Sequence, residues 1–169
     1  MLNRKIASAV LLAAFLVCIP GLEARAEDIS KSLVGTWRVT SYSRLTLETN
    51  EWSRPFGENV IGYLQYSPGG HMVVFLSGGG MPKASPPYSD ADKTAFFNNS
   101  FGAYAGTYSV DGNKVTHHVV ASWRPDWVGG DQIRFVELNG DRLTVKTAPL
   151  VSSLTGKQIV STLTFERIE

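Results

Sequence analysis

The stretch YAGTYSVDGNKVTHHVV, Tyr104 to Val120, decides the fold. Two runs of alternating aromatic, β-branched and polar residues flank Asp111-Gly112, a pair that favours a type I′ turn between antiparallel strands. A second such unit follows, in which Asn139-Gly140 joins Gln132–Leu138 to Arg142–Lys146. Connections this short favour an up-and-down antiparallel sheet over parallel strands joined by helices.

The same signals divide the rest of the chain into about eight strand candidates, the number that an all-β barrel uses to close around one small ligand. The candidates are Val34–Leu45, Val60–Tyr66, His71–Leu76, Phe101–Val110, Lys114–Trp123, Gln132–Leu138, Arg142–Lys146 and Gln158–Arg167.

Residues 78–100 interrupt this pattern between strands three and four. Three consecutive glycines and three prolines exclude regular structure at first, and Ser89-Asp90-Ala91-Asp92 then resembles a capping box that opens a short helix through about Asn98. This helical insertion is either a lid over one mouth of the barrel or a surface excursion that covers nothing.

The N-terminal segment is typical of a signal peptide. Arg4 and Lys5 precede an apolar run from Ile6 to Ile19, and Ala24-Arg25-Ala26 has the small-x-small pattern of a cleavage site. We expect residues 1–26 to be removed and residues 27–169 to form one periplasmic or secreted domain. The apolar run is short for a membrane span.

Cleavage changes both the charge and the cysteine count. The chain has 16 Lys+Arg and 15 Asp+Glu, of which the segment takes three and one, leaving 13 and 14 and a net charge of −1. This balance gives no reason to expect nucleic acid or an acidic membrane as partner. The only cysteine, Cys18, leaves as well, so the mature chain has no disulfide. A lipoprotein anchored through Cys18 is the alternative, although Val17 is larger than such signals prefer.

The first hairpin predicts which side chains face the lumen. With Asp111-Gly112 as a two-residue loop, Gly106 lies opposite His117 and leaves room for its ring, while His118 points to solvent. The inner face then carries Tyr104, Tyr108, His117, Val119, Ala121 and Trp123.

The second hairpin places an arginine inside the barrel. With Asn139-Gly140 as the loop, Glu137 meets Arg142 on the outer face, and the inner face carries Gln132, Arg134 and Val136. A buried guanidinium requires an acceptor. An internal carboxylate, a cluster of carbonyls or a ligand could supply it. None of these inner faces carries an acidic residue, which leaves carbonyls, a ligand or ordered water in a polar cavity as candidates.

The first and last strands suggest how one end of the barrel closes. Trp37 and Val39 share a face of the first strand, while Leu163 and Phe165 point inward from the last. Arg167 then lies at the barrel end, where it can stack on the Trp37 ring by a cation–π contact.

With these residues the chain resembles the lipocalin and calycin barrels, and more closely the bacterial lipocalin-like domain family. The resemblance covers nearly all of the mature chain and rests on Leu33-Val34-Gly35-Thr36-Trp37, Pro55-Phe56-Gly57, Ile61-Gly62-Tyr63-Leu64, Tyr104-Ala105-Gly106-Thr107-Tyr108, Val115-Thr116-His117-His118-Val119, Trp127-Val128-Gly129-Gly130-Asp131-Gln132 and Gly140-Asp141-Arg142-Leu143. It implies an eight-stranded lipocalin-like barrel, and relatives of this fold bind hydrophobic small molecules. The chain departs from eukaryotic lipocalins in lacking disulfide cysteines and in its helical insertion.

Neither a metal ion nor another cofactor is expected. Adjacent residues on a strand point to opposite faces, so His117 and His118 cannot share one ion. The sequence also lacks the nucleophile-elbow pattern typical of Ser–His–Asp hydrolases.

Three functions remain open. The favoured one is an exported protein whose lumen binds a small hydrophobic molecule with a polar or anionic end. The predicted ligand-binding residues are Arg134, His117, Tyr104, Tyr108, Trp123 and Gln132. The second is a cofactor-independent isomerase or cyclase, since an imidazole, a guanidinium and phenols together can polarise a carbonyl and move a proton. The third is an inert structural or interaction module with a filled lumen.

Overall fold

The computed structural model describes residues 29–79, 85–99, 101–153 and 155–169. The predicted signal peptide and its cleavage site lie outside these ranges. None of the helices within them is both long and apolar enough to cross a bilayer.

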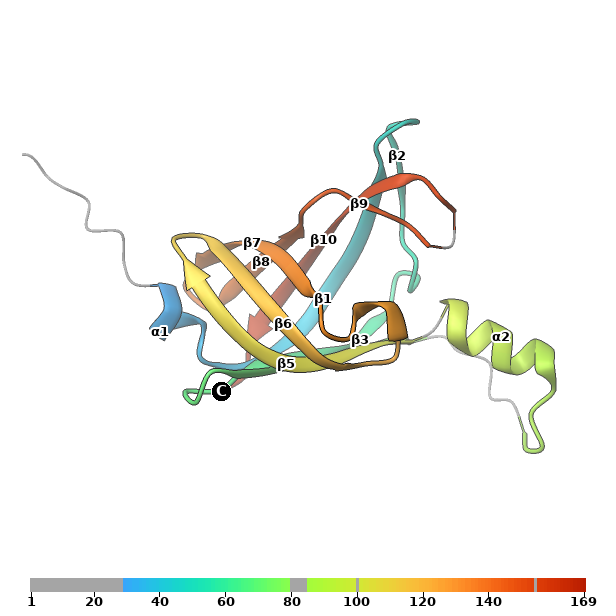
Figure 1. Cartoon of the computed structure of the whole chain (residues 1–169), viewed down its shortest axis with the longest axis horizontal. Coiled ribbons are helices and arrows are strands. Elements are labelled where there is room, and N and C mark those ends of the chain that lie inside the picture. The colour runs from blue at the N-terminus through green and yellow to red at the C-terminus, as the bar shows by residue number, and fades with distance from the viewer. Residues whose placement is uncertain (1–28, 80–84, 100, 154) are drawn as a thin grey trace, which may run out of the picture.

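Eight long strands of the described chain close into an antiparallel barrel, which confirms the predicted fold class (Figure 1). They follow the order β1-β3-β4-β5-β6-β7-β8-β10, and β10 pairs again with β1. Two short strands, β2 and β9, lengthen the sheet beside β1 and β10. The elements are α1 (Ile29–Leu33), β1 (Gly35–Thr46), β2 (Glu51–Ser53), β3 (Val60–Tyr66), β4 (His71–Gly78), α2 (Asp90–Asn99), β5 (Phe101–Asp111), β6 (Lys114–Ser122), the 3₁₀ turn η1 (Pro125–Trp127), β7 (Asp131–Asn139), β8 (Arg142–Thr147), β9 (Leu150–Val151) and β10 (Gln158–Arg167).

Helix α1 lies at one end of the barrel (Figure 1), and side chains close that end. The Trp37 ring is fully buried, and its Nε1 donates to the carbonyl of Leu33 at 2.9 Å. The Arg167 guanidinium lies 4.1 Å from the centre of that ring and donates to the carbonyls of Val34, at 2.8 Å, and Ser32. Because the aromatic ring and the last turn of α1 are fixed together, the lumen is blocked at this end.

Both hairpin loops lie one residue further along the chain than the sequence predicts. The loops are Gly112-Asn113 and Gly140-Asp141, with φ of 58° and 57° at the glycines. Among the described residues of these loops only the glycines have positive φ, which fits a type II′ turn rather than type I′. Each cross-strand partner therefore shifts by two residues, and His117 pairs with Tyr108. An even shift leaves every residue on its predicted face.

Two bulges change which side chains face the lumen near the open end. Thr40 is the extra residue of β1 opposite β10, and Val120 is the extra residue of β6 opposite β5. Val120 and Ala121 are consequently both exposed, so the predicted inward orientation of Ala121 is wrong. Bulges are common at barrel rims because they re-aim side chains there.

Gly106 is explained by the second bulge rather than by the His117 ring. It pairs with Val119, and a Cβ at this position would lie 1.9 Å from the carbonyl oxygen of His118. The backbones of β5 and β6 thus approach too closely for any side chain.

Helix α2, the described helical part of the insertion, lies beside the barrel rather than over it. Helix α2 begins with a capping box, in which Ser89 Oγ accepts from the backbone N–H of Asp92 at 3.1 Å and the Asp92 carboxylate accepts from the backbone N–H of Ser89 at 3.0 Å. Figure 1 shows α2 projecting away from the strands, and none of the side chains described for it, residues 90–96, lines the lumen cavity. Of the two alternatives for this insertion, the described part of α2 fits a surface excursion better than a lid over the barrel mouth.

The close approach at Gly106 gives the first prediction. Gly106→Ala should lower the free energy of unfolding by about 3 kcal/mol, because backbone must move to admit the new methyl. Gly102→Ala, on the same strand, would meet only side-chain atoms, of Phe56 at 3.4 Å and Trp123 at 3.9 Å, and should change the free energy of unfolding by less than about 1 kcal/mol. Urea denaturation measures the free energy of unfolding of both variants. An equal decrease in the two would show that the close approach at Gly106 does not affect stability.

Candidate functional site

The open half of the barrel encloses a cavity of about 390 Å³. Its wall is largely apolar, formed by Leu64, Val74, Leu76, Val145, Leu163 and Phe165. This volume and character suit a small apolar ligand. A cavity of this size also contradicts the filled lumen that an inert module would require.

His117 lies in this wall between two tyrosine hydroxyls. Its Nε2 is 2.8 Å from the hydroxyl of Tyr66, and its Nδ1 is 2.8 Å from the hydroxyl of Tyr104. The imidazole is only 1 % exposed. Burial, together with the nearby Arg134 charge, holds the pKa of His117 well below its usual range, so the ring is neutral.

The surroundings of Tyr66 fix which nitrogen of His117 carries the proton. Tyr66 is 1 % exposed, burial raises the pKa of its hydroxyl, and His117 is its one hydrogen-bond partner among the described residues. Its O–H must therefore donate to Nε2, since the alternative leaves a buried donor unsatisfied. The proton of the neutral ring is then on Nδ1 and donates to the Tyr104 oxygen.

Arg134 places a positive charge beside the same hydroxyl. The side chain is 6 % exposed, and its Nη1 donates to the Ile133 carbonyl at 2.9 Å. Its Nη2 donates to the Tyr104 hydroxyl at 3.2 Å and, more weakly, to Gln132 Oε1 at 3.5 Å. Within the described ranges no carboxylate forms an ion pair with this guanidinium. The Tyr104 oxygen accepts from both Arg134 and His117, so its own O–H is left to donate toward the cavity.

The loop after β6 covers part of the mouth. Trp123 lines the cavity just beyond the end of β6, and the Trp127 ring meets the Tyr104 ring edge-on at 5.4 Å. Arg124 stacks over Trp127 at 4.9 Å and pairs with Asp126 at 2.5 Å. This packing limits the movement of the Tyr104 ring on the side that faces solvent.

Two of the predicted ligand-binding residues do not line the cavity. Tyr108 lies nearer the closed end, where its ring packs edge-on against Tyr66 at 4.8 Å and its hydroxyl donates to the Ser67 carbonyl at 3.1 Å. Gln132 contacts Arg134 from beside it on β7. Tyr108 therefore contacts Tyr66 and Ser67, and Gln132 contacts Arg134, instead of lining the cavity.

Sequence reasoning missed Tyr42 and Arg44 on β1, which both line the cavity. Simple alternation from Trp37 and Val39 would point them outward, and the bulge at Thr40 reverses this. The Arg44 Nη2 donates to the Tyr42 hydroxyl at 2.6 Å. A bulge of this kind has no clear sequence signature here.

Polar side chains face the cavity from β5, β6, β7, β8, β10 and β1, and we call this set the polar belt. Arg134 pairs across the sheet with Thr147, whose Oγ1 accepts from the backbone N–H of Ser161 at 3.0 Å. The Ser161 hydroxyl lies 3.2 Å from that of Tyr42. The polar belt comprises His117, Tyr104, Arg134, Thr147, Ser161, Tyr42 and Arg44.

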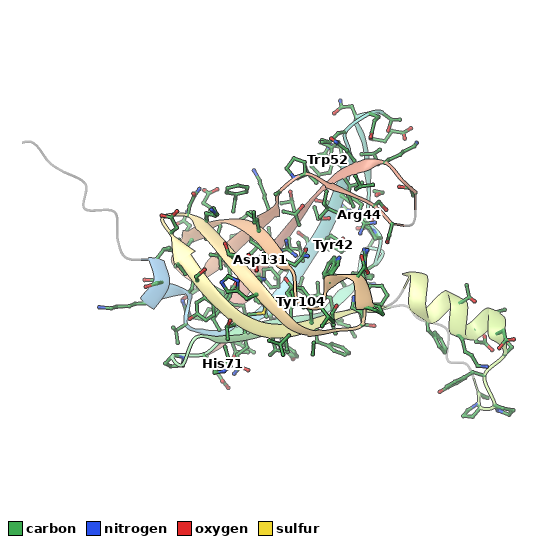
Figure 2. The ribbon with its side chains drawn as sticks, viewed as in Figure 1. Tyr42, Arg44, Trp52, His71, Tyr104 and Asp131 are labelled. Atoms are coloured by element: carbon green, nitrogen blue, oxygen red, sulfur yellow. The ribbon has the colours of Figure 1, made fainter. Side chains whose placement is uncertain are left out.

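The other histidines do not join this site. His118 points outward as predicted, with Nδ1 at 2.7 Å from Asp131 and Nε2 at 3.1 Å from Ser109. This exposed Ser–His–Asp arrangement lies on the outer wall, and none of the three residues lines the cavity. His71 is exposed at the start of β4, as Figure 2 shows. No group of three or more metal-ligating side chains is found among the described residues.

Comparison with known proteins decides the family. The sequence pattern of the lipocalin-like domain matches residues 34–168. The chain belongs to the lipocalin-like domain family. All strands of the lipocalin-like barrel lie within this matched region, and the resemblance noted in the sequence is confirmed.

Solved structures similar to this lipocalin-like chain share only low identity with it. A protein from Bacteroides eggerthii is 10 % identical and has a TM-score of 0.39, over 80 % of this chain and 98 % of its own. A protein named REP1-NXSQ fatty acid transporter is 11 % identical and also has a TM-score of 0.39, over 82 % and 98 %. Similarity at this level supports no argument about function. No curated protein matches the sequence significantly.

The neutral state of His117 predicts a pH dependence of stability. Because its folded-state pKa is lowered, the unfolded chain takes up the proton first as pH falls, and stability is lost below about pH 6.5. Between pH 7.5 and 5.5 this should remove roughly 1 kcal/mol from the free energy of unfolding. His117→Gln stays neutral and should show a flatter profile by urea denaturation at both values. Parallel profiles for the two proteins would contradict a buried neutral imidazole.

Proposed function

We propose that this protein is exported and binds a small apolar molecule with an anionic end in its lumen. The observation that carries the proposal is Arg134, a charged side chain buried against the cavity and held only by neutral acceptors in the described chain. The signal-like segment supports export, and mass spectrometry of the exported protein should then give Glu27 as its first residue.

The hydrogen-bond arrangement suits a carboxylate or a similar oxygen acid. A carboxylate beside Arg134 would receive charge-assisted hydrogen bonds from the guanidinium and an additional one from the Tyr104 hydroxyl. His117 positions Tyr104 by donating to its oxygen, so the three residues form one donor set. The apolar remainder of the ligand would lie against the apolar side chains of the cavity wall, such as Val74 and Phe165.

The isomerase or cyclase alternative has one feature in its favour and one against it. The Arg134–Tyr104 donor pair would polarise a carbonyl oxygen, as oxyanion sites do. Such reactions also require a base beside the reacting carbon. Of the described residues that line the cavity, Asp126 alone is a carboxylate, and Arg124 already pairs with it at the mouth. Both ring nitrogens of His117 are engaged by tyrosines. Binding is therefore the function that this arrangement favours.

Titration with dodecanoate tests the role of Arg134. Isothermal titration should detect binding to the wild type, with affinity lowered about 10- to 100-fold in Arg134→Gln because charge-assisted hydrogen bonds are lost. Arg38→Gln serves as the matched control, since Arg38 is an exposed arginine paired with Glu166 on the outer wall. It should bind dodecanoate as the wild type does.

A ligand-side comparison covers the possibility that Arg134→Gln folds poorly. Dodecanol has the same chain without the charge and should bind the wild type more weakly than dodecanoate. No binding of dodecanoate to the wild type, or equal binding by wild type and a folded Arg134→Gln, would overturn the proposal.

A further inference from the structure

Arg44 places a second guanidinium on the wall of the same cavity. It lies on β1, which is three strands from β7 around the barrel through β8 and β10. In Figure 2, Tyr104, Tyr42 and Arg44 follow one another toward the end of the barrel from which β1 and β2 project. Arg44 is thus nearer the rim than the Arg134 network.

The hydrogen bonding of Arg44 is incomplete. Its Nη2 donates to the Tyr42 hydroxyl at 2.6 Å, but its Nε is buried and has no hydrogen-bond partner in the described chain. Arg44 also forms no ion pair with any described residue. Native proteins contain few buried donors without a partner, and each such donor lowers stability by about 1–3 kcal/mol. An acceptor supplied by a ligand would satisfy this one.

The charges around the cavity point the same way. The described residues that line it include Arg44, Arg124 and Arg134 and a single acid, Asp126, a formal charge of +2. Asp126 is paired with Arg124. A ligand with one carboxylate on Arg134 would leave the Arg44 charge uncompensated in a largely apolar space, where unpaired charge is unfavourable.

We propose that Arg44 forms a second anion-binding subsite, so that the preferred ligand is an apolar molecule with an acidic group at each end. This inference rests on the proposed function and extends it. One carboxylate would bind Arg134 and Tyr104, the other would accept from Arg44 Nε, and the chain between them would lie against the apolar wall. Between the two subsites lie Thr147, which pairs with Arg134 across the sheet, Ser161 and Tyr42.

The test compares dodecanedioate with dodecanoate by isothermal titration. The wild type should bind the diacid about tenfold more tightly, because the second carboxylate gains a charge-assisted hydrogen bond. In Arg44→Gln the ratio of diacid affinity to monoacid affinity should fall to about one. Arg38→Gln, which alters an arginine on the outer face of the same strand, should keep the full advantage.

The monomethyl ester of dodecanedioate provides a comparison that needs no variant. It keeps the length of the diacid but has one carboxylate, and it should bind the wild type about as dodecanoate does. A diacid that binds no more tightly than its ester, or an advantage unchanged in Arg44→Gln, overturns the second subsite. If dodecanoate still binds through Arg134 in that case, the proposed function stands. If neither acid binds the wild type, both proposals fail.

Discussion

The burial of the Arg134 guanidinium without a carboxylate partner is the constraint on which the rest of the site depends. Three neutral oxygens hold it, from Ile133, Tyr104 and Gln132. Such contacts offset part of the desolvation of a charge but do not neutralise it. Placed on the wall of a cavity rather than in packed core, the charge remains available to an anion that enters from the mouth.

The hydrogen-bond chain behind Arg134 has a direction that begins in the core. Tyr66 is buried with one partner, so its proton must go to His117, and the proton of His117 must go to Tyr104. The hydroxyl that reaches the cavity therefore acts as a donor. A core tyrosine that never touches the ligand would in this way set what kind of atom the ligand presents. The Arg167–Trp37 stacking at the closed end is not part of this series of hydrogen bonds.

Most of the fold and part of the site follow from local sequence patterns. Turn signals and alternation place the eight long strands and the inward faces of His117 and Arg134. The faces are correct even though both loops are shifted by one residue, because each partner then moves by two. The bulge at Thr40 has a different effect. One extra residue reverses the faces of the residues that follow it on β1, and this turns Tyr42 and Arg44 inward.

Gly106 carries the one sequence signal of a bulge. A glycine within an aromatic and β-branched strand indicates close approach of another backbone, and the bulged β6 makes that approach. The sequence alone suggests room for a side chain equally well. Alternation predicts whether a side chain faces the lumen, but not how far along the barrel it lies. Tyr108 faces inward near the closed end, and the sequence does not distinguish it from inward residues nearer the mouth.

The ionisation of a bound fatty acid tests the central claim most directly. Dodecanoate isotope-labelled at its carboxyl carbon reports its own protonation by NMR when bound to the protein and titrated with acid. If Arg134 and Tyr104 hold its carboxylate, the pKa of the bound acid should lie below that of the free acid, and it should rise in Arg134→Gln. A bound pKa above that of the free acid in the wild type, as expected for a carboxyl buried in an apolar lumen without a charged partner, would contradict the account.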